Sequence, residues 1–176
     1  MCMMTEIQIT KDNADESIRR LYETAFPEGE QIPWEDLMRL IEAMPLDFTA
    51  YYEDEQFIGF TITYPRRTFN WFWYFAVREE LREKGYGRRI FSQLMKKYQG
   101  QPSVLDMESP YQEPCPNPEQ RKRRHAFYVR LGFRDTHLFK TYNGITMTIM
   151  MAGPGTFTMQ DWDDIVGELK QFWWPE

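Results

Sequence analysis

The sequence predicts one α/β domain built on a mixed sheet, in which a central pair of parallel strands is flanked by helices. Two β-prone runs around the polar turn EDEQ, 47–52 and 57–64, and a third run at 70–77 are typical of an antiparallel meander. From residue 71 to residue 108 the order is then strand, glycine-containing loop, helix and strand, which predicts a right-handed βαβ unit. A β-prone run on each side of Asn143-Gly144 predicts a closing hairpin.

Helical periodicity and turn residues place the other elements. A short strand is expected around Glu6, and the helix after the glycine loop is expected to end at Gly100. We expect further helices at 13–25, after Pro33, from Asn117 to Gly132, and from Trp162 to Phe172. Residues 1–152 are interpreted as a single domain and residues 153–176 as a C-terminal amphipathic helical extension packed on it. The extension could instead cover a pocket or join two protomers.

The composition disfavours several functional classes. The 176 residues include 27 Asp and Glu against 21 Lys and Arg, and the net charge of -6 disfavours nucleic acid and anionic membranes as partners. Cys2 and Cys115 lie far apart, which favours neither a disulfide framework nor a cysteine metal site. No apolar run approaches the roughly 20 residues that span a bilayer. We therefore expect a cytoplasmic protein, monomeric or homodimeric, that binds no metal, nucleic acid or membrane.

The stretch REKGYGRR, residues 82–89, places two glycines and four cations between the third strand of the meander and the next helix. Such a loop can direct backbone N–H groups and the positive end of the helix dipole at one anion, and pyrophosphate would fit it. The chain has no Gly-Lys-Ser/Thr sequence of a P-loop, and Ile90 stands where a dinucleotide fingerprint requires a third glycine or alanine. The alternative is a simple turn with solvated cations.

Two motifs carry a resemblance to a known family. The spacing Arg82-x-x-Gly85-x-Gly87 resembles motif A of the GCN5-related N-acetyltransferase (GNAT) superfamily, and AFYVRLGF, residues 126–133, resembles its motif B. The resemblance implies the GNAT acyl-CoA acyltransferase fold, in which the loop binds the pyrophosphate of acetyl-CoA and pantetheine lies between two splayed parallel strands. The implied acetyl-CoA-binding residues are Phe75, Ala76, Val77, Arg82, Glu83, Lys84, Gly85, Tyr86, Gly87 and Arg88.

The same resemblance implies a reaction. The protein is expected to be an acetyl-CoA-dependent N-acyltransferase in which an amine attacks the thioester directly. Tyr128, in motif B, is implied to protonate the departing thiolate, and a backbone N–H at the distorted end of the strand 75–77 is implied to stabilise the oxyanion. The alternative for Tyr128 is a core role, because Phe127, Tyr128 and Leu131 share a helical face.

The proton acceptor is sought on the strand 103–108. Asp106 and Glu108 alternate with apolar residues, so both carboxylates face one side of the sheet, near the strand end where α/β sheets bind ligands. Glu108 is the predicted base, and two solvent-facing acids are the alternative. His125, His137 and the basic run RKRR, residues 121–124, are interpreted as surface features.

The loop PEGEQIPW, residues 27–34, joins the first two predicted helices, and in the family this loop usually helps to form the acceptor pocket. The resemblance therefore implies substrate contacts from Glu28, Glu30 and Trp34, and the two glutamates favour a cationic acceptor. Both glutamates could equally be ordinary loop residues. The predicted function is transfer of an acetyl group from acetyl-CoA to a primary amine of a small molecule or a protein. The alternative is a non-catalytic acyl-CoA-binding sensor, which keeps the glycine loop and lacks turnover.

Overall fold

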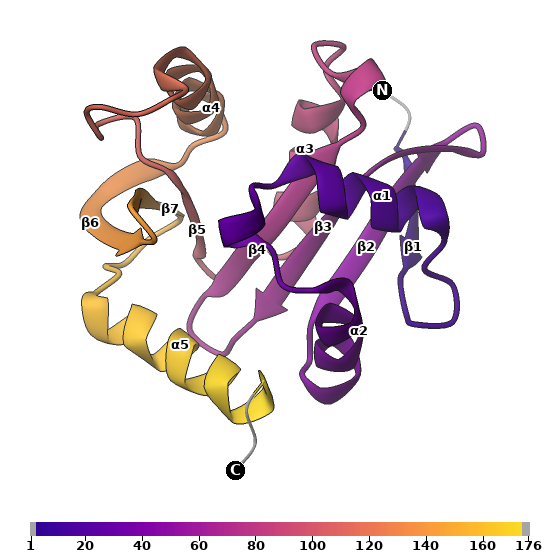
Figure 1. Ribbon diagram of the computed structural model, residues 1–176, viewed down its shortest axis with the longest axis horizontal. Helices are drawn as coiled ribbons and strands as arrows, with labels where there is room; N and C mark the ends of the chain where they lie inside the picture. The colour runs from indigo at the N-terminus through magenta and orange to yellow at the C-terminus, as the bar shows by residue number, and fades with distance from the viewer. Residues whose placement is uncertain (1–2, 174–176) are drawn as a thin grey trace.

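Figure 1 shows the computed structural model of the chain, a twisted sheet with helices packed on it. It describes residues 3–173; Cys2 and the last three residues of the segment QFWWPE lie outside the described residues. The strands are β1 (Thr5–Gln8), β2 (Asp47–Glu53), β3 (Gln56–Pro65), β4 (Asn70–Val77), β5 (Ser103–Glu108), β6 (Arg134–Tyr142) and β7 (Ile145–Ala152). The helices are α1 (Glu16–Ala25), α2 (Trp34–Ala43), α3 (Tyr86–Lys97), α4 (Pro118–Arg130) and α5 (Met159–Trp173), with 3-10 turns at Glu28–Glu30 and Glu79–Leu81. Every helix and strand that the sequence predicts is therefore present.

The strands of the described chain form one mixed sheet in the order β1-β2-β3-β4-β5-β7-β6. All neighbouring pairs are antiparallel except β4 and β5, which run parallel. This pair confirms the predicted βαβ unit, because α3 connects β4 to β5. The hairpin turn at Asn143-Gly144 is confirmed as well, since both residues have positive φ angles, 49° and 80°, as a type I′ turn requires.

Helices cover both faces of the sheet. α1, α2 and α5 share one hydrophobic cluster, in which the buried Ile18 and Leu37 pack with Phe60 of the sheet. α3 and α4 share a second cluster, in which Phe91 and Tyr128 pack with β4 and β5 residues. Because helices lie on both sides, β3 is buried along nearly its whole length.

The C-terminal helix α5 packs on the sheet of its own chain. Trp162 and Ile165 are buried in the cluster of α1 and α2. Glu168 accepts two hydrogen bonds from Arg66, which follows β3, at 2.9 and 2.7 Å. These contacts are those expected if the C-terminal extension packs on its own domain.

The Asn117 side chain, just before α4, bonds to polar groups around Glu108. The helix begins at Pro118 as expected, yet the Asn117 side chain does not cap it. Its amide nitrogen donates to Glu108 at 3.4 Å and to Gln120 at 3.0 Å, and its oxygen accepts from Arg121 at 2.8 Å. The polar groups around Glu108 therefore compete successfully with the helix N-terminus for this side chain.

Candidate active site

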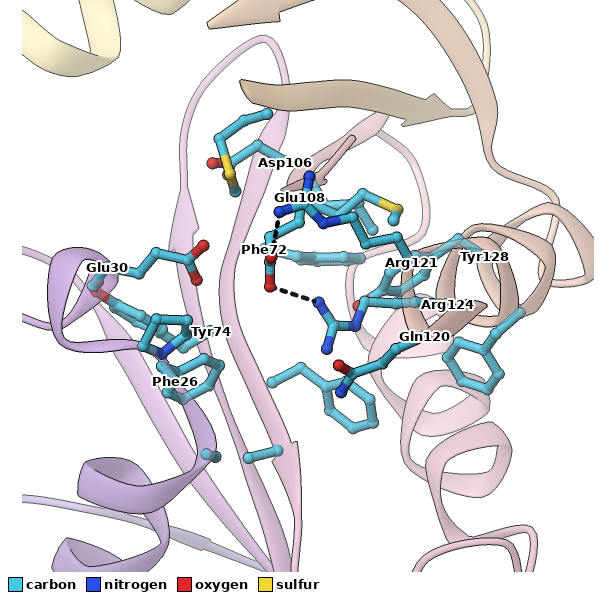
Figure 2. A pocket seen from close by; sticks show the side chains of 18 of the residues that line it. Phe26, Glu30, Phe72, Tyr74, Asp106, Glu108, Gln120, Arg121, Arg124 and Tyr128 are labelled. Atoms are coloured by element: carbon cyan, nitrogen blue, oxygen red, sulfur yellow. Dashed lines mark hydrogen bonds and ion pairs between the residues drawn. The ribbon is translucent and has the colours of Figure 1, made fainter. Parts of the chain in front are cut away.

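β4 and β5 pair only at their beginnings. The parallel pairing joins Asn70–Phe72 to Ser103–Leu105 and ends there, at the level of a β-bulge at Trp73 of β4. Beyond this point a cavity of about 1720 Å³ is lined by both strands, and Figure 2 shows side chains from several elements converging on it. The Arg78 N–H donates to β3, at 3.0 Å from the Ile58 oxygen. Because N–H directions alternate along a strand, the Val77 N–H points to the opposite edge, which borders the cavity.

The N-terminus of α3 also borders the cavity. Gly85 precedes the helix with a φ of 84°, in the left-handed region that glycine adopts without strain. No side chain caps this helix, and its first turn contains no acidic residue. The N–H groups of Tyr86, Gly87 and Arg88 therefore lack intrahelical acceptors and are available to an anion, which the helix dipole favours. This geometry fits the pyrophosphate of acetyl-CoA.

The residues around Gly85 shape and charge this loop. Arg82 donates through Nε to the Val77 carbonyl at 3.1 Å and so fastens the loop to the end of β4. Glu83 is exposed and has a φ of 63°. Lys84 and Arg88 are exposed at the start of the helix and form no ion pair with any residue that the structure describes, so both can contact a phosphate.

The position of Arg89 in the loop REKGYGRR suggests a phosphate contact, but its side chain lies against protein groups. It pairs with Glu53 at the end of β2 and lies over the ring of Tyr86, whose hydroxyl donates to Glu53 at 3.0 Å. Arg89 therefore links α3 to β2, and its position does not support a phosphate contact.

Gly87 lies between two aromatic rings. Phe75 of β4 and Phe127 of α4 stack with an interplanar angle of 2° and ring centroids 6.3 Å apart. A Cβ atom at position 87 would lie 3.3 Å from the Cζ atom of each ring. Gly85, by contrast, has open space around it. Position 85 therefore favours glycine for its φ angle, and glycine at position 87 permits close packing of α3 on the two rings.

Tyr128 lies in α4, where its ring packs against Phe91 and Phe133 with centroid distances of 5.5 and 5.9 Å. The residue is buried and borders the cavity. The pKa of the phenol is raised to about 12, mainly by burial, with a lowering contribution from Arg124 and a smaller raising one from Asp106. The phenol is thus protonated at neutral pH, as a proton donor must be. Both roles that the sequence predicts, acid and core residue, are compatible with this position.

Glu108, at the end of β5, is held by two arginines of α4. The Arg121 guanidinium lies 2.9 Å from one carboxylate oxygen, and that of Arg124 lies 3.5 Å from the other. Figure 2 shows both contacts as dashed lines. Arg121 is only 1% exposed, and it also donates to Asn117, Ser109 and Gln112. The charge of Glu108 is therefore balanced within the protein.

The interpretation of RKRR as a surface run is wrong for two of its members. Lys122 and Arg123 are exposed, but Arg121 is buried and Arg124 is partly buried against Glu108. The spacing could have indicated this arrangement, because residues 121, 124 and 128 recur at helical intervals and place the arginines on the face of Tyr128.

Two further carboxylates face the cavity, and neither has a cationic partner among the described residues. Asp106 accepts a hydrogen bond from Trp71 Nε1 at 3.1 Å, and burial raises its pKa to about 6. Glu30 lies in the 3-10 turn Glu28–Glu30, and Figure 2 shows its side chain pointing across the cavity toward Glu108. The pKa of Glu30 is raised to about 7, mainly by burial and also by the carboxylates of Glu108 and Asp106, while Arg124 and Arg121 lower it.

Of the three predicted acceptor contacts, Glu30 lines the cavity, whereas Glu28 and Trp34 do not. Glu28 is exposed, and Trp34 packs in the core, 5.7 Å from the ring of Tyr22. The expectation that Glu28 and Trp34 contact the acceptor therefore has no support from their positions. The sequence analysis did not identify the aromatic side chains that border the cavity near Asp106 and Glu30, which are Trp71, Trp73, Tyr74, Tyr142 and Trp162.

The histidines lie outside the cavity lining. His125 is partly buried and contacts Asp135 at 3.0 Å, and His137 has a φ of 63° in an irregular part of β6. Among residues 3–173, no group of three or more His, Cys, Asp or Glu side chains could hold a metal ion. No helix in the part of the chain that the structure describes is long and apolar enough to cross a membrane.

Comparisons with known proteins agree with this geometry. A family profile described as the acetyltransferase (GNAT) domain matches residues 46–135, whereas no curated protein sequence matches the chain. A solved structure assigned to the GNAT acetyltransferases, from Bacteroides thetaiotaomicron, is 23% identical, with coverage of 95% of this chain and 96% of that chain and a TM-score of 0.77.

Two other solved structures resemble the fold at lower identity. A GNAT family acetyltransferase from Elizabethkingia anophelis with acetyl-CoA bound is 14% identical over 88% of this chain and 100% of that chain, with a TM-score of 0.63. An aminoglycoside 6′-N-acetyltransferase complexed with coenzyme A is 15% identical over the same shares, with a TM-score of 0.66. The family match spans half of the chain and includes the glycine loop and the separated parallel strands, and the chain therefore belongs to the GNAT acetyltransferase family.

Proposed function

We propose that the protein is an N-acetyltransferase that transfers the acetyl group of acetyl-CoA to a primary amine, and that the amine attacks the thioester directly. The observation that carries this proposal is the separation of β4 from β5 beside the uncapped N-terminus of α3, which combines an extended cleft with an anion site. The similar proteins that hold acetyl-CoA or coenzyme A support acetyl-CoA as the second substrate.

In this proposal the pyrophosphate accepts hydrogen bonds from the N–H groups of Tyr86, Gly87 and Arg88, and Lys84 and Arg88 add charge. The pantetheine chain lies along the β4 edge formed by Phe75, Ala76 and Val77, whose cavity-side backbone groups are not paired with β5. One of these N–H groups stabilises the oxyanion that forms when the amine attacks.

Tyr128 is proposed to protonate the departing thiolate, since its phenol is protonated at neutral pH and borders the cavity. The sequence favours Glu108 as the base. However, Arg121 and Arg124 contact both oxygens of its carboxylate, and we therefore propose that Glu108 holds α4 against β5.

The proposal is tested by calorimetric titration of the protein with acetyl-CoA, followed by a free-thiol release assay across a panel of amines. Binding together with thiol release on a class of primary amines would support the proposal. Binding without release on any amine would favour the sensor alternative. Absence of binding would mean that REKGYGRR is a turn without an anion site.

A further inference from the structure

Glu30 has a fixed backbone position in the cavity wall. Its carbonyl oxygen accepts a hydrogen bond from the Tyr74 hydroxyl of β4 at 2.7 Å, and its N–H donates to Pro27 at 2.9 Å. Two residues later, the Ile32 carbonyl accepts from the Tyr22 hydroxyl of α1 at 2.7 Å. These bonds hold the segment between α1 and α2 against the sheet and α1. The Cα atom of Glu30, from which its side chain extends, therefore has a fixed position.

The Glu30 carboxylate lacks a partner. Its Oε1 atom is buried and has no hydrogen-bond partner among the described residues. A buried carboxylate oxygen without a donor is unfavourable, because the oxygen has lost its hydration and gained nothing in return. A ligand that brings an N–H donor would remove this penalty.

The cations near Glu30 do not supply that donor. Arg121 and Arg124 are the nearby cations that affect Glu30, and both are engaged with Glu108. Asp106 likewise has no ion-pair partner among residues 3–173, and its one side-chain hydrogen bond comes from the neutral Trp71 indole. The cavity thus presents two carboxylates that lack a cation, which a protonated amine can provide.

The walls around these carboxylates are aromatic. Trp71 and Trp73 stack at 4.7 Å between ring centroids, Trp73 stacks on Tyr74 at 5.0 Å, and Trp162 of α5 meets Trp71 at 5.7 Å. Aromatic rings favour apolar groups, and they also attract an ammonium group over their faces. The lining therefore suits an amine that is attached to an aromatic or apolar body.

We propose that Glu30 is a catalytic residue that receives the ammonium group of the acceptor and removes its proton, and that the acceptor is a primary amine on an aromatic or apolar body. This inference rests on the proposed function. It differs from the expectation for Glu108, because Glu30 has a free oxygen and Glu108 does not.

The ammonium group loses two protons during the reaction. The ammonium gives one proton to the Glu30 carboxylate, which passes it to solvent after the reaction. The neutral amine then forms the C–N bond as its lone pair attacks the thioester carbonyl. When the C–S bond breaks, the thiolate takes a proton from Tyr128, and the second proton of the amine nitrogen restores the phenol. The products are the N-acetyl amine, coenzyme A with a free thiol, and one proton in solution.

The charged surroundings of Glu30 suit this role. Its pKa is raised to about 7 by burial, first of all, and by the carboxylates of Glu108 and Asp106, against the opposing effect of Arg124 and Arg121. A base with a pKa near the working pH is ionised in a large fraction of molecules and still accepts a proton readily. The rate on a primary amine is therefore expected to increase as the pH rises through about 7.

The first experiment compares the pH dependence of kcat/KM for the wild type, Glu30→Gln, Glu108→Gln and the surface control Glu35→Gln, with the best amine from the panel. We expect Glu30→Gln to lower kcat/KM by about 100-fold or more and to lose the ascending limb near pH 7, with unchanged acetyl-CoA affinity. Glu35→Gln, in which the replaced side chain is 74% exposed, should match the wild type. If Glu30→Gln retains the limb while Glu108→Gln loses it, the inference is overturned.

The second experiment needs no turnover and uses benzylammonium as the probe, with benzyl alcohol as its uncharged analogue. Tryptophan fluorescence should report binding, because Trp71, Trp73 and Trp162 line the cavity. We expect benzylammonium to bind Glu30→Gln at least about tenfold more weakly than the wild type, and benzyl alcohol to bind both proteins equally. Equal affinities for benzylammonium would overturn the inference even if the protein acetylates an amine. Loss of thiol release with every amine would instead overturn the proposed function.

Discussion

Removal of the buried guanidinium of Arg121 tests the charge balance of the cavity most directly. In Arg121→Met the side chain stays long and unbranched, but it loses the 2.9 Å ion pair with Glu108 and hydrogen bonds of 2.8, 3.2 and 2.8 Å to Asn117, Ser109 and Gln112. Glu108 then keeps the 3.5 Å contact with Arg124 and the 3.4 Å hydrogen bond from the neutral Asn117 amide. The variant thus leaves a buried carboxylate almost unpaired.

The expected cost follows from this geometry. Breaking a buried ion pair by removal of one partner typically costs about 3–5 kcal/mol, because the other charge stays desolvated. The side chains of Arg121 and Glu108 are 2% and 9% exposed, so little solvent can take over the lost contacts. We expect the free energy of unfolding of Arg121→Met to fall within that range. The double variant Arg121→Met/Glu108→Leu should lose less than the sum of the two single variants, since it leaves no unpaired charge.

The assay is urea denaturation, with the unfolding free energy and the m-value fitted for each variant. Lys122→Met is the matched control, because this neighbour in the same helix is 62% exposed and contacts Glu119 at 3.6 Å. Its unfolding free energy should change by less than about 0.5 kcal/mol. A loss below about 1 kcal/mol in Arg121→Met at an unchanged m-value, or strict additivity in the double variant, would refute the reasoning.

Four further outcomes are expected. Tyr128→Phe should keep its affinity for acetyl-CoA and lower kcat by about 100-fold, and an unchanged kcat in the thiol-release assay would assign Tyr128 to the core alone. Gly87→Ala places a Cβ 3.3 Å from two aromatic rings, which must shift by a few tenths of an ångström, so acetyl-CoA binding should weaken in calorimetry; because alanine also favours the helix, the unfolding free energy in urea should change by less than about 1 kcal/mol. Gly59→Ala places a methyl group 2.3 Å from the Ala76 carbonyl oxygen, so β3 and β4 must move apart. It should be the most destabilising of these variants in thermal unfolding, and a wild-type Tm would contradict the strand register. Because the pKa of Glu30 is raised from 4.5 to about 7, the folded wild type binds this proton more tightly than the unfolded chain does, and its unfolding free energy falls between these pH values. Glu30→Gln should therefore be more stable than the wild type above pH 7, by about 1–2 kcal/mol after allowance for solvent screening, and equally stable below pH 4.5 in urea titrations at each pH.

Local patterns were sufficient to predict the fold and the position of the glycine loop between β4 and α3. The periods of the helices and strands, the Asn143-Gly144 turn and the Gly85-x-Gly87 spacing all depend on residues close together in the sequence. Gly85 has a positive φ angle, which its position in the loop itself determines. The family match over residues 46–135 covers the same region that carries these patterns.

The remaining features depend on contacts between distant segments, which the residue pattern alone does not specify. Glu28 and Glu30 are equivalent in the sequence, but the Tyr74 hydroxyl, 44 residues away, holds the turn so that Glu30 enters the cavity. Arg121 is buried because the carboxylate of Glu108 comes to meet it from β5. The space for a side chain at position 87 is likewise limited by Phe75 and Phe127, which belong to two other elements.

The balance of charges around Glu30 is a further reason to assign proton transfer to Glu30 and not to Glu108. The charged groups that act on Glu30 are the carboxylates of Glu108 and Asp106 and the guanidiniums of Arg124 and Arg121, so this group of five is one positive charge short when all its members are ionised. A bound ammonium group makes the group neutral. Once its proton has moved to Glu30, two carboxylates remain with two guanidiniums, and the group is neutral again. Neither state leaves a buried charge without a counterpart, which is the condition for a low cost of proton transfer in a poorly solvated site. Transfer to Glu108 would instead leave Arg121 opposite a neutral partner, and identical side-chain chemistry thus leads to different roles through different neighbours.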